Sequence, residues 1–203
     1  MLHIGVTGGI GSGKSTFLRV WEQLGVPVVY ADDLAKELMA TDQDLKEKIV
    51  RAFGEPSYRP DGSLNRKYLA EAAFAAGRVG ELNEIVHPAV YRELEVRKKR
   101  AEESGSPLFA HESALLLASG RKGVCDVIVL IVSREDERIR RVTERDGADQ
   151  GSVVNRIRKQ PDFERLSGKA DYVVHNDGSI SSLENRAEEL YRELVKKSGT
   201  MEP

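Results

Sequence analysis

The fold is decided by the stretch Gly8-Gly9-Ile10-Gly11-Ser12-Gly13-Lys14-Ser15. Its spacing, G-x-x-x-x-G-K-[ST], is that of a phosphate-binding P-loop. An apolar run, residues 2 to 7, precedes this stretch, and an amphipathic segment, residues 14 to 24, follows it. A glycine-rich turn that binds nothing is the alternative, but the whole motif and both flanking segments favour a nucleotide site between a strand and a helix.

Each part of the motif has a physical task. Glycine permits backbone angles that would clash with a side chain, so the N–H groups of residues 10 to 15 can turn toward phosphate oxygens. The helix that begins there adds the positive end of its dipole. Lys14 is expected to neutralise charge on the β- and γ-phosphates of ATP, and the Ser15 hydroxyl is expected to ligate Mg²⁺. The expected ATP-binding residues of this segment are Gly9, Ile10, Gly11, Ser12, Gly13, Lys14, Ser15 and Thr16.

The motif alone does not separate kinases from GTPases or mechanical ATPases. GTPases read guanine through an Asn-Lys-x-Asp loop, and the chain contains no such tetrapeptide. We therefore expect an ATP-dependent phosphoryl-transfer enzyme rather than a GTPase.

Short apolar, β-branched runs recur between segments with helical periodicity, which predicts a parallel sheet covered by helices. The runs are residues 2–7, 27–31, 107–111, 126–133 and 170–175. The predicted fold class is α/β, a three-layer P-loop NTPase fold with a five-stranded parallel sheet.

Two helical insertions interrupt this alternation. Helices are expected at residues 44–53, 65–76 and 88–103, so residues 36–104 are expected to form one inserted lobe and residues 1–35 with 105–203 the nucleotide-binding core. A second, arginine-rich insertion covers about residues 134–169. The closing helix, residues 179–197, is expected to bury one face made of Leu183, Ala187, Leu190 and Leu194.

Composition limits the remaining classes of function. The chain has 203 residues, a formal net charge of −2 and one cysteine, Cys125. Its longest apolar run near the middle, residues 127–132, is far shorter than a membrane span, and its start does not read as a signal peptide. We expect a cytoplasmic protein that binds neither nucleic acid nor membrane.

Two adjacent carboxylates, Asp32 and Asp33, follow the second apolar run. The carboxyl ends of parallel strands meet at one edge of a sheet, so these residues are expected on the same side as the P-loop. A carboxylate there suits an alcohol acceptor, because it can take the hydroxyl proton, whereas a phosphate acceptor would need arginines. Asp32 is expected to carry the chemistry, and Asp33 to cap a helix over residues 34–39.

Several polar side chains of the C-terminal half are further candidates. Arg138, Arg141 and Arg145 share a helix face by spacing, and Arg141 is expected to contact ATP phosphate, although such runs are often only solvated surface. Arg156 lies further along the same insertion and is a further candidate for binding ATP. Asn176, just after the last strand, is expected near adenine, or else forms a turn with the two residues that follow it.

The ordered set of motifs resembles the dephospho-CoA kinase family over nearly the whole chain. The residues that carry the resemblance are the P-loop with Thr7 and Thr16, Asp32, Leu64-Asn65-Arg66 with Phe74, His87-Pro88, Glu112 with Ala114-Leu115-Leu116, Arg141, Arg156 with Gln160, and residues 170–174 leading to Asn176 and Gly178. His87-Pro88 followed by Glu112-x-Ala-Leu-Leu makes this family preferable to related kinases.

The resemblance implies a reaction and roles for these residues. Members of the family transfer the γ-phosphoryl group of ATP, with Mg²⁺, to the 3′-hydroxyl of dephospho-CoA, which completes coenzyme A. Asp32 then resembles the catalytic base, with Lys14 and Arg141 stabilising the transferred group. Arg66, His87 and Glu112 resemble substrate contacts, residues 36–104 a CoA-binding lobe, and residues 134–169 a lid. From the residues themselves, Pro88 is expected to begin a helix and Glu112 to lie near the metal through water.

Two other hypotheses about the function of the chain stay open at this point. One is a small-molecule P-loop kinase that acts on a nucleoside, nucleotide or sugar. The other is a regulator that only senses ATP, although Lys14, Ser15 and Asp32 together argue against a degenerate site. A monomer or a weak homo-oligomer is expected.

Overall fold

The structure is a computed structural model that describes residues 1–75, 77–114, 116–117 and 124–199. The chain divides into two compact units. The core unit consists of Met1–Val29 and Arg100–Pro203, and the helical unit consists of Tyr30–Lys99.

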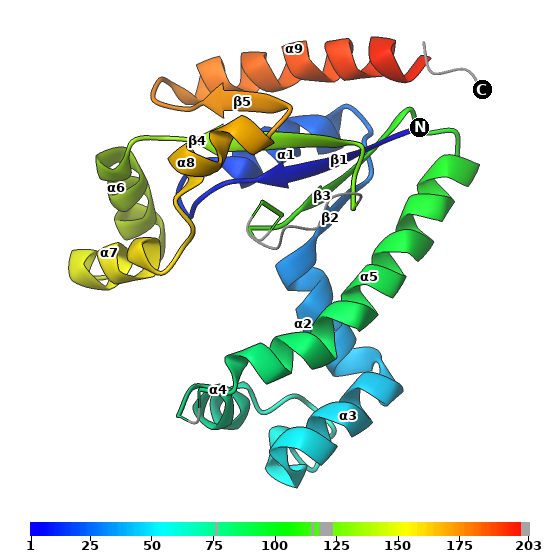
Figure 1. The fold of residues 1–203 in the computed structure, drawn as a ribbon, viewed down its shortest axis with the longest axis vertical. Helices are drawn as coiled ribbons and strands as arrows, with labels where there is room; N and C mark the ends of the chain where they lie inside the picture. Colours follow the sequence, from blue (N-terminus) through cyan, green and yellow to red (C-terminus); the bar gives the residue numbers. More distant parts are fainter. Residues whose placement is uncertain (76, 115, 118–123, 200–203) are drawn as a thin grey trace. The chain divides into compact units, whose positions relative to one another are not determined.

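A five-stranded parallel sheet organises the core unit. Its strand order is β2-β3-β1-β4-β5, so β1 lies in the middle (Figure 1). Parallel pairing places Leu2 opposite Leu108, Ile4 opposite Val127, and Val129 opposite Tyr172. The strands are β1 (Leu2–Thr7), β2 (Val28–Tyr30), β3 (Leu108–Glu112), β4 (Val127–Val132) and β5 (Tyr172–His175). The predicted α/β fold and all five strands are confirmed.

Helices α1 (Lys14–Gln23) and α9 (Ile180–Gly199) pack against each other beside the sheet (Figure 1). The Trp21 indole Nε1 donates a hydrogen bond of 2.9 Å to the Ala187 carbonyl oxygen, and this contact is fully buried. The four residues expected on the inner face of the last helix, Leu183, Ala187, Leu190 and Leu194, are all buried. Helix α1 is therefore anchored along its length, and its N-terminus holds the P-loop.

A second apolar cluster lies where the short helix α8 (Phe163–Leu166) packs on β4. Its buried members are Leu117, Leu130 and Phe163.

Two histidine side chains meet in the interior of the core unit, where β1 pairs with β3. The His3 Nε2 and His111 Nδ1 atoms lie 2.8 Å apart. Burial, followed by the neighbouring His3, lowers the pKa of His111 to about 3. His111 is therefore a buried residue of the core, with 2% of its surface exposed.

The second insertion forms a helical layer over the P-loop. It contains α6 (Glu135–Asp146), α7 (Gln150–Arg158), α8 and the 3-10 turn η2 (Ser167–Lys169). Val142, Val153 and Ile157 make a small buried cluster against Ile10 of the P-loop. This cluster attaches α6 and α7 directly to the loop.

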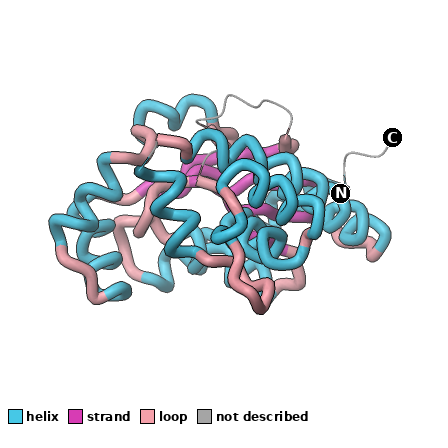
Figure 2. The backbone as a smooth tube through the Cα atoms, turned by 90° about the horizontal axis from the view of Figure 1, so that it is seen from below, coloured by secondary structure: helices cyan, strands magenta, loops and turns pink. Residues whose placement is uncertain are grey.

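The helical unit contains four main helices, which together with the others make most of the chain helical (Figure 2). They are α2 (Ala31–Thr41), α3 (Gln43–Phe53), α4 (Arg66–Ala75) and the greater part of α5 (Val79–Glu103), with a 3-10 turn η1 (Glu55–Ser57) after α3. Asp42 caps α3 by accepting a hydrogen bond of 3.0 Å from the Leu45 N–H. Arg78 joins α3 to α5, because it donates to the Ala52 carbonyl oxygen at 2.8 Å and to Glu81.

Two expected helix starts are wrong. Helix α5 begins at Val79, nine residues before Pro88, and contains this proline in its interior. Proline costs one backbone hydrogen bond, but Val86, Ala89 and Val90 on either side are buried, and this packing outweighs the local penalty. Helix α2 begins at Ala31, so Asp33 lies in its first turn and does not cap it. The Asp33 carboxylate instead pairs with Lys36 at 2.6 Å.

Among the described residues, no helix combines the length and apolar character that crossing a membrane requires.

Candidate active site

The P-loop turns tightly between β1 and α1. Gly13, at the start of α1, has φ of 102°, a left-handed conformation that favours glycine. A Cβ atom at this position would also overlap the side-chain amide of Asn176. The glycine is required both by its backbone angle and by the close approach of the residue that follows β5.

Lys14 folds back over its own loop. Its Nζ donates to the carbonyl oxygens of Gly8 and Gly9, at 3.0 and 3.3 Å. The same Nζ lies 3.4 Å from the Glu112 carboxylate at the end of β3, and both side chains are only about one-seventh exposed, at 13% and 14%. The start of α1 and the end of β3 therefore bring a cation and an acid together beside the loop.

The N–H of Ile10 is an exception to the expected pattern. It donates a hydrogen bond of 2.8 Å to the Gln160 side-chain oxygen, so it is not turned into the loop for a phosphate. In the sequence, Gln160 stands out only as part of a family pattern. No spacing rule indicates that its side chain meets the P-loop.

A cleft of about 670 Å³ opens along the P-loop and the beginning of α9. It is lined by eight of the predicted residues, which come from three separate segments: Ile10, Gly11, Gly13, Lys14, Ser15, Thr16, Arg141 and Asn176. Gly9 and Ser12 line a second cavity of about 320 Å³ together with Arg138 and Gln160. Arg156 lines neither cavity.

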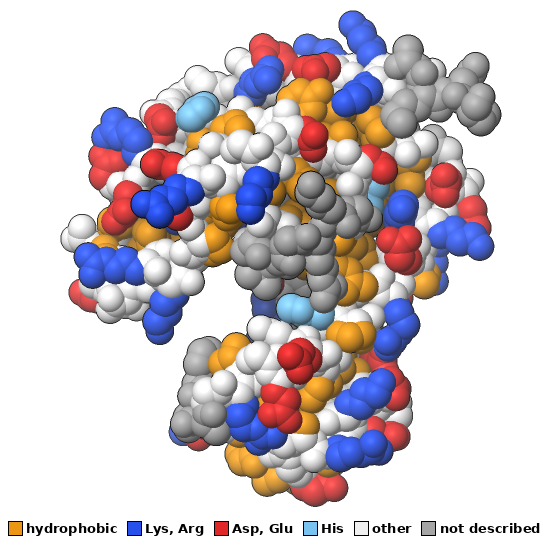
Figure 3. Space-filling model, viewed as in Figure 1, with side chains coloured by type: hydrophobic (Ala, Val, Ile, Leu, Met, Phe, Trp, Pro, Cys, Tyr) orange, Lys and Arg blue, Asp and Glu red, His pale blue; other side chains and the backbone are white. Residues whose placement is uncertain are grey.

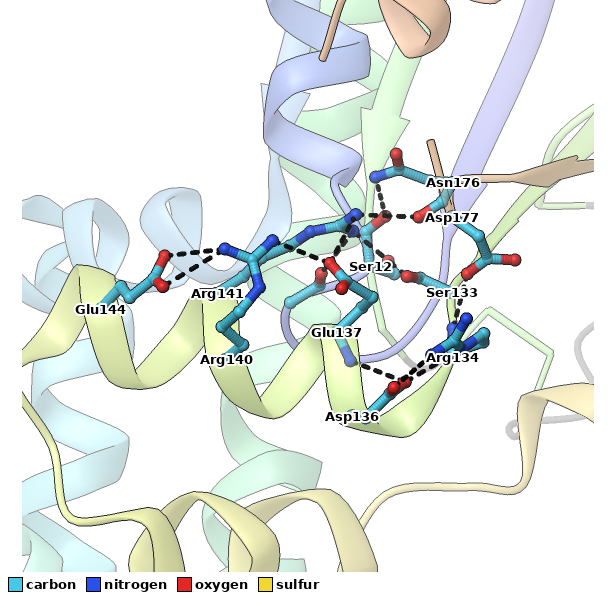
Figure 4. A network of polar contacts seen from close by, with 11 residues as sticks. Ser12, Ser133, Arg134, Asp136, Glu137, Arg140, Arg141, Glu144, Asn176 and Asp177 are labelled. Carbon is cyan, nitrogen blue, oxygen red and sulfur yellow. Dashed lines mark hydrogen bonds and ion pairs between the residues drawn. The ribbon is translucent and has the colours of Figure 1, made fainter. Parts of the chain in front are cut away.

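Arg141 is held in place by a network that links α6 to the ends of β4 and β5 (Figure 4). Its guanidinium donates to the Ser133 hydroxyl at 3.1 Å and to the Asn176 carbonyl oxygen at 3.0 Å. It also lies 3.5 Å from the Glu137 carboxylate. The side chain is therefore fixed at the edge of the cleft rather than extended into solvent.

Asn176 is buried, with 6% of its surface exposed. Its side-chain Nδ2 donates 2.8 Å to the Ser12 carbonyl oxygen, and this bond ties the end of β5 to the P-loop (Figure 4). A contact of Asn176 with adenine stays a prediction. The tie to Ser12 is a role that sequence reasoning missed.

Arg145 and Arg156 share one partner. Both bind Asp146, at 2.7 Å from Arg145 Nε and 3.1 Å from Arg156 Nη1. Hydrogen bonds from these two guanidinium groups lower the pKa of Asp146 to about 2. The structure therefore places Arg156 in an exposed ion-pair group between α6 and α7, whose other arginine, Arg145, lines the larger cleft.

The remaining candidates belong to the helical unit. Asp32 lies exposed in the first turn of α2, and no hydrogen bond or ion pair of its carboxylate occurs among the described residues. Arg66 begins α4, and His87 contacts the Tyr91 ring inside α5, with the ring centres 6.3 Å apart. Leu115 and the side chain of Phe74, two carriers of the family resemblance, lie outside the described part.

The residues beside the P-loop suit a phosphate-bound Mg²⁺. This ion usually keeps several waters and takes only one or two protein ligands beside substrate phosphates. Ser15 is exposed and lines the cleft, and the Glu112 carboxylate lies next to Lys14. Within the described ranges, no group of three or more His, Cys, Asp or Glu side chains could hold a metal by itself.

Comparison with known proteins identifies the family. The family model for dephospho-CoA kinase matches residues 2–182. The chain belongs to the dephospho-CoA kinase family. A Salinibacter ruber dephospho-CoA kinase is 45% identical over 192 residues, which cover 94% of this chain and 96% of the relative.

Two solved structures are similar to this member of the dephospho-CoA kinase family. A Thermus thermophilus protein is 34% identical, with a TM-score of 0.79 and coverage of 95% of this chain and 97% of its own. The dephospho-CoA kinase from Campylobacter jejuni has a TM-score of 0.70 at 23% identity, with 98% of both chains covered, and supports the fold alone.

Membership of the family settles the reaction class. The chain is a kinase of coenzyme A biosynthesis that uses ATP as a substrate. Its reaction is that of the dephospho-CoA kinase family, transfer of the γ-phosphoryl group of ATP to the 3′-hydroxyl of dephospho-CoA, with coenzyme A and ADP as products.

Proposed function

We propose that this chain performs the dephospho-CoA kinase reaction with ATP phosphates seated in residues 8–16 and Asp32 acting on the acceptor hydroxyl. The observation that carries the proposal is the P-loop between β1 and α1, with Lys14 and Glu112 brought together beside it. A chain of the dephospho-CoA kinase family with this loop has the parts that phosphoryl transfer needs.

On the ATP side, the proposed contacts are charges and dipoles that stabilise the transferring phosphoryl group. Lys14 and the start of α1 supply positive charge and N–H donors to the β- and γ-phosphates. Arg141 is proposed to add a second cation at the edge of the cleft, where Ser133 and Asn176 already hold its guanidinium. Preorganised groups that stabilise developing charge usually contribute more to such catalysis than any other effect.

For Mg²⁺, the Ser15 hydroxyl is the proposed protein ligand, and Glu112 is proposed to act through water. When bound there, the ion would supply positive charge that offsets the negative charge of the phosphates. Ser15 is suited to this role because its hydroxyl lies on the cleft wall one residue after Lys14.

On the acceptor side, the proposed base is Asp32. A carboxylate that acts as a general base must be accessible, so that it can accept the proton of the substrate hydroxyl. Asp32 is exposed and forms no ion pair among the described residues, whereas the neighbouring Asp33 is already paired with Lys36. We propose residues 36–104 as the CoA-binding lobe, with Arg66 and His87 among its substrate contacts. Arg156 of the lid is proposed as a contact to ATP and not to the acceptor.

The proposal also covers partners and location. The formal net charge of −2 gives no general attraction to nucleic acid, and acidic and basic side chains are mixed over the face shown in Figure 3, so we propose that the chain does not bind nucleic acid. The thiol of Cys125 forms no disulfide, which fits a reducing compartment such as the cytoplasm. A monomer or a weak homo-oligomer is proposed.

A panel of acceptors tests the function directly. Dephospho-CoA, AMP, adenosine and shikimate are each mixed with the protein and Mg²⁺-ATP, and release of ADP is measured. We expect acceptor-dependent ADP release with dephospho-CoA well above that with the other three compounds. Equal rates with AMP or shikimate would reassign the acceptor, and ADP release that needs no acceptor would indicate an ATPase.

Arg141→Ala is expected to lower kcat more than it raises the KM of dephospho-CoA. The reason is that its proposed charge acts on the phosphoryl group in the transition state and not on the resting acceptor. Arg165→Ala is the matched control, because Arg165 is an arginine of the same insertion whose side chain is 88% exposed and, within the described ranges, pairs only with Asp162. An unchanged kcat with a raised acceptor KM would place Arg141 at the acceptor site instead.

Residues 134–169 are proposed to act as a lid that closes over bound nucleotide, because phosphoryl transfer must exclude water that would hydrolyse ATP. Hydrogen exchange of α6 and α7 is expected to slow when a bisubstrate mimic, dephospho-CoA joined to ATP through phosphates, is added. The second half of α9 serves as the internal control, since Leu190 and Leu194 are already fully buried there. Unchanged exchange in α6 and α7 would rule out the lid.

A further inference from the structure

Side chains of the arginine-rich insertion form hydrogen bonds with both the N–H and the carbonyl oxygen of Ile10. Its N–H donates to the Gln160 Oε1 at 2.8 Å, and its carbonyl oxygen accepts from the Arg138 Nε at 2.9 Å. The Arg138 Nη2 also donates to the same Gln160 oxygen, at 3.2 Å. These three hydrogen bonds form a closed triangle between one residue of the P-loop and two residues of the insertion.

The two residues of the insertion that form this triangle are held by helices α6 and α7. Arg138 lies in the second turn of α6, and Gln160 follows α7, where its own N–H donates to the Ile157 carbonyl oxygen at 3.0 Å. Ile157 belongs to the buried cluster that packs on Ile10. Apolar packing and hydrogen bonds therefore hold the same segment of the loop from the same side.

Gly9 shows how closely Arg138 approaches the P-loop. A Cβ atom at Gly9 would overlap the Arg138 guanidinium, although Gly9 itself does not have a positive φ. A side chain at residue 9 would therefore have to push the Arg138 guanidinium aside. The arginine therefore lies directly over the loop between β1 and α1.

Arg138 differs from its neighbours on α6 in the partners that its guanidinium uses. Arg140 binds Glu137 and Glu144, and Arg145 binds Asp146. In the part of the chain that the structure describes, Arg138 forms no ion pair, and its side chain donates to two neutral oxygens. Burial lowers the pKa of this guanidinium, while the more distant charges of Glu135 and Glu164 act in the opposite direction.

We propose that Gln160 is a positioning residue of the phosphate site, which fixes the Ile10 peptide and the Arg138 guanidinium relative to the P-loop before chemistry occurs. One side-chain oxygen accepts from both donors, so Gln160 sets the place of a backbone segment and of a cation at the same time. This inference rests on the proposed function of the loop as the ATP site, and it assigns Gln160 no contact with substrate.

The first test uses exchange of the Ile10 amide proton, measured by NMR without nucleotide. Gln160→Met keeps the length of the side chain and removes the strong acceptor, so exchange at Ile10 is expected to quicken at least tenfold. Gln160→Glu keeps the acceptor and should leave this amide protected. Gln150→Met is the control, because Gln150 is an exposed glutamine at the start of α7. Equal Ile10 exchange in the two methionine variants would overturn the proposal.

The second test uses steady-state kinetics with Mg²⁺-ATP and dephospho-CoA. Gln160→Met is expected to lower kcat by about tenfold with less than about a threefold change in the KM of ATP, which is the pattern of a lost transition-state interaction. A residue that merely stabilised the insertion would lower the Tm and leave kcat close to that of Gln150→Met.

A double variant checks that Gln160 acts through Arg138. If both side chains hold the same loop segment, Arg138→Met with Gln160→Met should have a kcat within about twofold of Arg138→Met alone. Multiplied losses would show independent roles and overturn the proposal. The parent protein is assayed first, so a parent with no dephospho-CoA-dependent turnover refutes the proposed function, whereas an active parent with an unaffected Gln160→Met refutes only this inference.

Discussion

Asp32→Asn is expected to reduce turnover of dephospho-CoA by roughly 10²- to 10⁴-fold, the usual range of general-base assistance. Asparagine keeps the size of the side chain and loses its basicity. Asp32 is exposed in the first turn of α2 and belongs to no ion pair among the described residues, so the change should barely disturb the fold. Binding of Mg²⁺-ATP, measured by calorimetry, should stay close to that of the parent.

Asp33→Asn is the matched control for this prediction. It removes an exposed pair with Lys36, in which the two side chains are 72% and 50% exposed, and such pairs contribute little to stability. Turnover should therefore fall by no more than a few fold. If Asp33→Asn were the inactive enzyme and Asp32→Asn the active one, the assignment of the two carboxylates would be reversed.

Lys14→Ala is expected to lower turnover by roughly 10²-fold or more, because the loop loses the cation proposed to balance phosphate charge during transfer. The same Nζ contacts two carbonyl oxygens of the loop and the Glu112 carboxylate. Some loss of stability is therefore expected as well, since Glu112 loses one cationic partner. Turnover and thermal unfolding need to be measured on the same preparations.

The double variant Lys14→Ala with Glu112→Gln separates the two effects of losing Lys14. Removing the negative charge should recover part of the lost Tm and none of the turnover. Lys36→Ala serves as the control for removal of an exposed lysine. Near-normal turnover in Lys14→Ala would contradict the assignment of residues 8–15 as the phosphate site.

The sheet could be predicted because its signals are local. Each strand is a short apolar run, and the observed strands differ from the expected runs by at most two residues at either end. The buried face of α9 follows from helical periodicity in the same way. Local rules failed at Pro88, which lies inside α5, and at Asp33, which is not a cap. At Pro88, packing on both sides of the residue outweighs the preference of the residue itself.

By itself, the sequence determined the fold class, the P-loop and the family, because these depend on short ordered motifs whose spacing carries the information. Only the tertiary structure decided which side chains surround the loop. Gln160 lies 150 positions from Ile10, and Asn176 lies 164 positions from Ser12, yet each forms a hydrogen bond of 2.8 Å. No periodicity spans such separations, because these contacts arise only when the sheet and the inserted helices fold back on the loop. The tertiary structure also shows that Arg156, part of a family pattern, pairs with Asp146 and lines neither cavity.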